Sequence, residues 1–327
     1  MNKVAWSSLL ALVATVAFAN GKPGPVRVFI LAGQSNMEGH GFVPADPKRN
    51  DGKGSLEYLA KNPATAKEFS ELVDGKGNWR SRDDVFISYL DRSGPLTVGY
   101  GAQKDMMGPE LGFGQVMGDT FKEPVLLIKC AWGGKSLAVD FRPPSAGKLP
   151  YSLGEKGDAA LAENPDMLGK YYRDTVGLVK NALTHVKDLV PGSDGRYVLS
   201  GFEWHQGWND RINEKFNAEY GSNMACFIRD IRKDLGAPKL PFVIAETGMT
   251  GPEEKNPRAL ALMKAQADVA DLPEFKGNVA FVPTKAFWRP VEESPTSQGY
   301  HWNTNAETYF LIGKAMGQAT KKLLGIR

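Results

Sequence analysis

The stretch Val26-Arg27-Val28-Phe29-Ile30-Leu31-Ala32-Gly33-Gln34-Ser35-Asn36-Met37 decides the fold. It begins as an almost unbroken apolar run rich in β-branched side chains, which is typical of a short strand buried on both faces of a parallel sheet. The run ends abruptly at Gly33-Gln34-Ser35-Asn36. Ligands of open α/β sheets bind just beyond the carboxyl ends of the strands, so Ser35 stands where a nucleophile would be placed. A helix N-cap or turn accounts for a serine at this position equally well.

Four more apolar runs are predicted strands, and they are Pro124–Lys129, Tyr197–Trp204, Pro241–Ala245 and Val279–Pro283. Helical patterns alternate with them, at Pro109–Thr120, Pro165–Val190, Ile212–Leu235, Asn256–Asp271 and Asn305–Leu324. This alternation predicts an α/β fold, a three-layer α/β/α sandwich around a five-stranded parallel sheet. The polar segment Pro44–Arg82 is expected to be a surface excursion, with Val85–Tyr89 as a strand of it. Ala131–Glu155 is expected to be a loop over the sheet edge.

The length and composition fit one large α/β domain or two small ones. The chain has 327 residues, of which 42% are hydrophobic, and this is ample for a sizeable core. The net charge is +3 from 40 basic and 37 acidic side chains, without any block of like charge. Nucleic acid and anionic membrane surfaces are therefore poor partner candidates.

The first residues read as a secretory signal peptide. Lys3 supplies a basic start, Leu9–Phe18 is an apolar run, and Ala17-Phe18-Ala19 is a small-x-small cleavage site. The run is too short to span a membrane, so a retained anchor is the weaker reading. We expect a signal peptide at residues 1–19, one domain at residues 20–327, and a secreted or periplasmic protein that keeps no membrane contact after cleavage.

Two cysteines, Cys130 and Cys226, stand in unrelated contexts. We expect two buried free thiols, because an exported chain of this size needs no disulfide to hold its core, although a bridge stays open. Two such cysteines exclude a thiolate zinc site.

Polar residues follow the ends of the predicted strands. These are Ser35, the glycine pair Gly133-Gly134, the segment Trp204–Asp210 and, before the last helix, Gln298–Asn303. As acyl-transfer machinery they have complementary roles. Ser35 would attack and His301 would act as general base. The Ser35 amide, an amide of Gly133 or Gly134, and the Asn209 side chain would hold the oxyanion. Taken singly, a turn, an N-cap and a structural histidine explain these residues better, and it is their joint placement at successive strand ends that favours catalysis.

Several motifs together resemble the SGNH hydrolases. They are Gly33-Gln34-Ser35-Asn36-Met37, Gly108-Pro109-Glu110, Gly133-Gly134-x-Ser136, His205-Gln206-Gly207-Trp208-Asn209-Asp210 and the late His301. More narrowly they look like the sialate O-acetylesterase and acetyl xylan esterase branch. The resemblance implies a flavodoxin-like sandwich, Ser35 as nucleophile, His301 as base, and an oxyanion hole from Ser35, Gly133 or Gly134, and Asn209. It also implies an acetylated carbohydrate as substrate and no cofactor or metal. Five flanking side chains are candidates for substrate binding, namely Gln34, Asn36, His205, Gln206 and Trp208.

One position departs from the family pattern. The family usually has an aspartate three residues before its histidine, and here that position is Gln298. Glutamine can orient the imidazole but adds no charge to stabilise its protonated form. Three readings stay open. The enzyme runs on a Ser35–His301 dyad, or a carboxylate from Glu246, Glu292 or Glu293 reaches the ring, or esterase activity is lost.

The leading hypothesis is an exported serine esterase that removes O-acetyl groups from carbohydrate. Because Gln298 replaces the usual aspartate, a second hypothesis stays open. In it the protein is a catalytically weakened carbohydrate-binding protein on the same scaffold. A third, a metal-dependent hydrolase using His40, His205, His301 and Asp210, is disfavoured because these histidines lack the close spacing of a metalloprotease site. The sequence leaves open which sugar is bound and the oligomeric state.

Overall fold

The strand β1 (Val26–Gly33) lies in the middle of a seven-stranded sheet with the order β4-β3-β6-β1-β7-β8-β9. The computed structural model describes residues 24–326, so the predicted signal peptide lies outside the described residues. The five predicted strands are all present and parallel, as β1, β6 (Val125–Ala131), β7 (Tyr197–His205), β8 (Phe242–Ala245) and β9 (Val279–Val282). Numbered along the chain, these five follow the flavodoxin-like order 2-1-3-4-5.

Two further strands extend the sheet beyond β6. β3 (Val85–Tyr89) pairs parallel with β6, and β4 (Arg92–Pro95) pairs antiparallel with β3. The sequence placed β3 in a separate excursion, so the predicted five-stranded sheet is corrected to seven strands. The local apolar pattern identifies a strand but not its partner, because pairing with β6 is a contact between distant parts of the chain.

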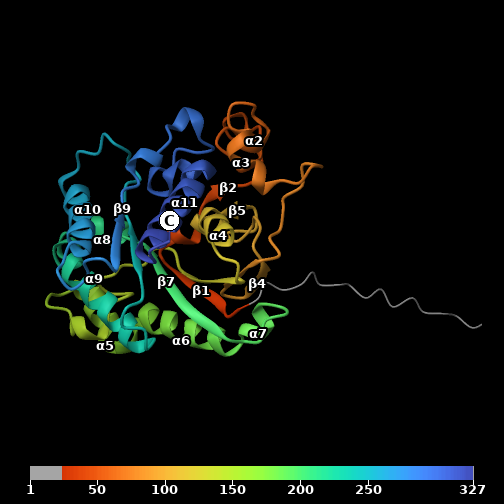
Figure 1. Cartoon of the computed structure of the whole chain (residues 1–327). Coiled ribbons are helices and arrows are strands. Elements are labelled where there is room, and N and C mark those ends of the chain that lie inside the picture. Colours follow the sequence, from red (N-terminus) through yellow and green to blue (C-terminus); the bar gives the residue numbers. More distant parts are fainter. Residues whose placement is uncertain (1–23, 327) are drawn as a thin grey trace, which may run out of the picture.

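Helices cover both faces of the sheet, which gives the predicted three layers (Figure 1). On one face lie α4 (Pro109–Thr120) and α11 (Ala306–Leu323), which contact each other extensively and pack on the apolar side chains of β1, β3 and β6. On the other face lie α6 (Lys170–Thr184), α9 (Glu214–Asp234) and α10 (Pro257–Ala270). β1 is buried on both faces, as its near-continuous apolar run predicted.

The limits of one expected helix and the burial of one cysteine differ from the structure. The helix expected from Pro165 begins at Lys170, because Gly169 adopts a left-handed φ of 70° and separates it from a short 3-10 turn at Pro165–Met167. The same pattern ends as a separate short helix, α7 (Val186–Leu189). Both cysteines are free, but only Cys130 is buried, whereas Cys226 on α9 is half-buried.

The remaining elements are short. They are α1 (Ser35–Glu38), β2 (Gly41–Phe42), α2 (Leu56–Lys61), α3 (Ala66–Phe69), β5 (Met106–Met107), α5 (Glu155–Glu163), α8 (Trp208–Arg211), and 3-10 turns at Asn50–Gly52, Ser70–Leu72, Pro144–Ala146, Lys285–Phe287, Val291–Glu293 and Gly299–Thr304. β2 and β5 pair with each other in a small second sheet. Among residues 24–326, no helix is both long and apolar enough to cross a membrane.

Candidate active site

The carboxyl ends of β1, β6 and β7 meet at one edge of the sheet. Gly33, the last residue of β1, pairs with Ala131 of β6 on one side and with His205 of β7 on the other. The chain order reverses around β1, so this edge is the switch point at which ligands of open α/β sheets bind. The segments that follow the three strands carry Ser35, Gly133-Gly134 and Asn209.

A cavity of about 340 Å³ opens at this edge. It is lined by Gln34, Ser35, Glu38, His40, Gly133, Gly134, Trp208, Asn209, Tyr300 and His301. The structure therefore brings the proposed nucleophile, base and oxyanion donors to one cavity, although they come from four separate parts of the chain.

Ser35 is the first residue of the short helix α1, directly after β1. Its side chain lies at the cavity and is 7% exposed. Within residues 24–326 its main-chain N–H donates to no other group, as expected for a residue in the first turn of a helix. A donor of this kind at a helix start suits a developing negative charge on a substrate oxygen.

Local geometry favours glycine at both positions of the pair. A Cβ at Gly133 would approach Glu38 Oε2 to 3.1 Å and would also contact Ser35, whereas Gly134 adopts a left-handed φ of 68°. The neighbouring Asn209 donates from Nδ2 to the Gly134 carbonyl oxygen (3.0 Å) and accepts from Gln34 Nε2 at Oδ1 (3.3 Å). These bonds fix the three predicted oxyanion segments relative to one another.

Asp210 ties the loop after β6 to α8. It is fully buried, and its two carboxyl oxygens accept the main-chain N–H of Leu137 and Ala138, both at 2.9 Å, and the Gln206 amide. Burial raises the pKa of Asp210 to about 7, although its three donors oppose this shift. The residue acts as a structural acceptor beneath the cavity.

His301 lies in the 3-10 turn Gly299–Thr304, just before α11. The three residues after it, Trp302, Asn303 and Thr304, all have left-handed φ values between 54° and 57°. Such backbone costs about 1–2 kcal/mol per residue, and strain of this kind is found where a site needs a particular direction of a side chain. All three residues are buried, so the surrounding packing holds the turn.

The His301 ring contacts two other rings, those of His40 and Tyr300, and no carboxylate of residues 24–326 bonds to it. Its Nδ1 is buried without a hydrogen-bond partner among the described residues, and no hydrogen bond joins the ring to Ser35 Oγ there. The ring stacks on His40, with centroids 3.8 Å apart and planes inclined by 10°. Burial, and then the neighbouring His40, lower the pKa of His301 to about 3, so the ring is neutral at neutral pH.

The structure places the residues considered as partners of this ring elsewhere. The Gln298 side chain is exposed, and only its main-chain oxygen accepts from the His301 N–H (2.8 Å). The Glu246 carboxylate is buried and accepts the main-chain N–H of Thr284 and Lys285. Glu292 and Glu293 are exposed and line a separate cavity beside α2. Among residues 24–326, none of the four side chains makes a hydrogen bond or an ion pair with the His301 ring.

The five candidates for substrate binding fall into two groups. Gln34 and Trp208 line the cavity. The other three candidates are buried beneath it, where their polar groups support the loops, and they are Asn36, His205 and Gln206. Asn36 donates to the Tyr300 carbonyl oxygen and Gln206 to that of Lys135, whereas the buried His205 ring faces the main chain of Asn36 and Glu246.

Sequence reasoning missed Glu38, considered His40 only as a metal ligand, and gave Tyr300 no role of its own. Glu38 and His40 follow the Ser35 motif directly, and Tyr300 precedes His301. Their spacing from Ser35 and His301 was the available signal, since residues beside a nucleophile and a base share its cavity. The stacking of His40 on His301 is a contact across almost the whole chain, and no local pattern indicates it.

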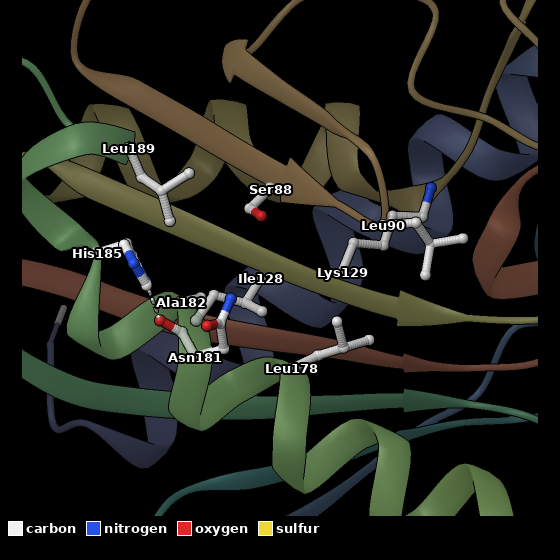
Figure 2. A pocket seen from close by; sticks show the side chains of 9 residues that line it. All are labelled: Ser88, Leu90, Ile128, Lys129, Leu178, Asn181, Ala182, His185 and Leu189. Carbon is white, nitrogen blue, oxygen red and sulfur yellow. Dashed lines mark hydrogen bonds between the residues drawn. The ribbon is translucent and has the colours of Figure 1, made fainter.

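A second cavity, of about 230 Å³, lies between α6 and the strands β3 and β6 (Figure 2). It contains a serine and a histidine, Ser88 and His185, but His185 Nδ1 bonds within its own helix, to the Asn181 carbonyl oxygen (2.8 Å). No hydrogen bond joins the two side chains among residues 24–326. Within the same residues, no three His, Cys, Asp or Glu side chains converge to hold a metal ion.

The flavodoxin-like sheet and the cavity at its carboxyl edge agree with the fold that the motifs led us to expect. Residues 25–322 match the family described as carbohydrate esterase, sialic acid-specific acetylesterase, and the chain belongs to that family. The protein is therefore a carboxylic-ester hydrolase that acts on carbohydrate. A comparison with curated protein sequences finds no significant match.

Two solved structures share the fold. A protein from Arabidopsis thaliana superposes with a TM-score of 0.55 at 17% identity, over 91% of this chain and 98% of its own. A novel carbohydrate acetylesterase from Xanthomonas citri superposes with a TM-score of 0.54 at 14% identity, over 90% of this chain. The match spans 56% of the Xanthomonas protein.

Proposed function

We propose that this protein is an exported O-acetylesterase that removes acetyl groups from carbohydrate through Ser35 and His301. The observation that carries the proposal is the convergence of both side chains on one cavity with the glycine pair and Asn209. Two N–H groups there, those of Ser35 and Gly134, donate to no other group among the described residues. A tetrahedral oxyanion needs donors of this kind, fixed in advance.

The reaction follows from these positions. Ser35 Oγ attacks the acetyl carbonyl carbon, and the neutral His301 ring accepts the hydroxyl proton. The oxyanion is held by the amides of Ser35 and of Gly133 or Gly134, together with the Asn209 side chain. The C–O bond to the sugar breaks, and His301 returns the proton to the sugar oxygen. Water, deprotonated by the same ring, then attacks the acetyl–Ser35 ester; the bond to Oγ breaks, the ring returns the proton to Ser35 Oγ, and acetate is released.

The mouth of the cavity suits a sugar ring. Trp208 and Tyr300 lie side by side with ring centroids 5.7 Å apart, and Tyr300 is 43% exposed. Aromatic faces beside polar groups suit the apolar face of a pyranose ring. The candidate substrates are an acetylated polysaccharide and an O-acetylated sialic acid-like sugar.

The test is acetate release from acetylated xylo-oligosaccharides and O-acetylated sialic acid, together with hydrolysis of a chromogenic acetate ester. Ser35→Ala is expected to abolish all three activities except for a background supplied by binding and the oxyanion donors. Ser222→Ala on the exposed face of α9 is the matched control and should keep full activity. Full activity of Ser35→Ala would show that Ser35 is not the nucleophile.

Export is a separate part of the proposal. It is supported by the basic start, short apolar run and small-residue cleavage site of residues 1–19. N-terminal sequencing of the protein from periplasm or medium should give a mature chain that begins near Asn20.

A further inference from the structure

The His40 and His301 rings form a stacked pair at the wall of the cavity. Their centroids lie 3.8 Å apart and their planes are nearly parallel. Two ring nitrogens, His40 Nε2 and His301 Nδ1, are buried without hydrogen-bond partners among the described residues. No hydrogen bond among the described residues orients the His301 ring through Nδ1. Two ring contacts limit its rotation instead, the flat contact with His40 and an edge-on contact with Tyr300, whose ring centroid lies 4.5 Å away.

A general base needs such a constraint. The ring must point its free nitrogen at the nucleophile, and a misplacement of about 1 Å costs about 100-fold in rate. In serine hydrolases a carboxylate usually holds the other nitrogen. Here Gln298 is exposed and Glu246 is bound to the loop after β9, so neither of them does this.

His40 lies among residues from several elements. Its Nε2 lies 3.9 Å from Glu38 Oε2, at the end of α1. Tyr309 of α11 lies 3.2 Å from the His301 carbonyl oxygen and donates to Asn36 Oδ1, so the same helix anchors both histidine segments. The largely buried His40 ring can therefore serve as a packing surface for its neighbour.

We propose that His40 is a positioning residue, whose ring holds the His301 ring in its catalytic orientation in place of a hydrogen-bonding carboxylate. The inference rests on the proposed role of His301 as general base. It assigns a function to a residue beside the nucleophile motif that does not itself touch the reacting atoms.

The pair also has an electrostatic consequence. A proton on either ring disfavours a proton on the other, because the two rings share a partly buried space. The groups that face His40 are Glu38 on α1, Lys129 on β6, His301 and Tyr309. Those that face Glu38 are Lys129, Arg92, the Tyr89 hydroxyl and the Gly133 amide. Lys129 and burial favour a neutral His40, so His301 works beside a neutral ring at neutral pH.

Two variants of His40 separate stacking from other effects. His40→Phe keeps a flat ring at this position, whereas His40→Ala removes it. We expect His40→Ala to lower kcat by about 10- to 100-fold with KM nearly unchanged, and His40→Phe to restore most of kcat. His185→Ala, on an exposed histidine, is the matched control and should behave as wild type. Thermal unfolding of each variant checks that the fold is kept.

The titration of the His301 ring gives a readout that does not depend on activity. Only four histidines are present, so two-dimensional NMR with single variants assigns each ring. In His40→Ala, water reaches the ring and the repulsion is removed, so the pKa of His301 should rise from about 3 towards its usual range, with His40→Phe between the two. The proposal is overturned if all three proteins give the same His301 titration, or if His40→Ala keeps wild-type kcat. A wild-type protein without esterase activity would instead refute the proposed function, and the titration would still test the pairing.

Discussion

Replacing Asn209 is the most direct test of the proposed oxyanion hole. In the free protein its Nδ2 donates to the Gly134 carbonyl oxygen, so this donor is already fixed at the cavity wall. Asn209→Ala should lower kcat by about 100- to 1000-fold, as expected for one lost oxyanion donor, with a small change in KM. Steady-state kinetics on a chromogenic acetate measure both constants. Asn181→Ala, on the exposed face of α6, serves as control, and an equal loss in that variant would point to an unspecific effect.

The variant Gln298→Asp tests whether His301 lacks the negatively charged partner that the family usually supplies at this position. The Gln298 side chain is exposed, but an aspartate at this position that turned towards the ring would stabilise its protonated form and raise the pKa of His301, which burial lowers to about 3. The acidic limb of kcat/KM, which reports the pKa of the base in the free enzyme, should therefore move to higher pH in Gln298→Asp, and activity at neutral pH should rise. The limb in wild type should lie near pH 3–4.

Glu246→Gln is the matched comparison. Its carboxylate is occupied by the amides of Thr284 and Lys285, so the variant should keep the wild-type limb even where stability falls. A limb that moves to lower pH in Glu246→Gln would show that this carboxylate does act on His301 and would contradict the dyad.

At the scale of secondary-structure elements, Asp210 fixes the position of α8 relative to the loop after β6. Its carboxyl group joins α8 to the loop after β6 by accepting two adjacent main-chain N–H groups. Asp210→Asn replaces one acceptor by a donor that faces an N–H, so we expect about 1–3 kcal/mol of lost stability. Because the same loop carries the glycine pair, kcat should fall about tenfold.

Chemical denaturation and kinetics measure the two effects of Asp210→Asn separately. Asp158→Asn is the matched control, because Asp158 also accepts a main-chain N–H, that of Leu153, but in an exposed loop. Lowered stability together with wild-type kcat would show that the loop after β6 does not need this anchor to place the glycine pair.

The elements of the fold were predictable where a local pattern determines them. Buried parallel strands read as continuous apolar runs, and all five predicted strands are present within a residue or two of their expected limits. Helix α4 has the predicted bounds because Pro109 marks its first turn and the apolar pattern stops at Thr120. The sequence did not predict that β3 joins the central sheet, because strand pairing depends on contacts between distant segments.

The location of the candidate site residues was likewise predictable only where a local pattern determines it. Strand ends place Ser35, Gly133-Gly134 and Asn209 at one edge, since parallel strands share their carboxyl side. The surroundings of His301 were not predictable, because its turn is irregular and left-handed at three successive residues. The burial of Asn36, His205 and Gln206 depends on the same long-range packing.

At the scale of the whole molecule, the buried histidines couple stability to pH. Burial lowers the pKa of His205 to about 4, and it lowers that of His40 to about 4 and that of His301 to about 3. In the unfolded chain these rings titrate near pH 6.5. Below that pH the unfolded chain binds protons that the folded protein does not, so the free energy of unfolding must fall as the pH is lowered.

Asp210 contributes with the opposite sign. Its pKa is raised to about 7 in the folded protein, so its stabilising contribution is present below about pH 4 and is lost as the pH rises through 7. The histidines lower the free energy of unfolding at acidic pH, and Asp210 lowers it as the pH rises towards 7. Together they predict that stability is greatest at an intermediate pH.

His205 isolates the histidine contribution, because it is fully buried and lies outside the cavity. With its pKa near 4, it should account for about 2 kcal/mol of the stability lost between pH 7.5 and pH 5. His205→Leu removes the titrating ring while it keeps a buried apolar side chain, so its free energy of unfolding should fall less over this interval. Urea unfolding at both pH values, for wild type, His205→Leu and the exposed control His185→Leu, measures the difference. If His205→Leu and wild type lose equal stability while His185→Leu also follows wild type, His205 is protonated equally in both states and the burial argument fails for this residue.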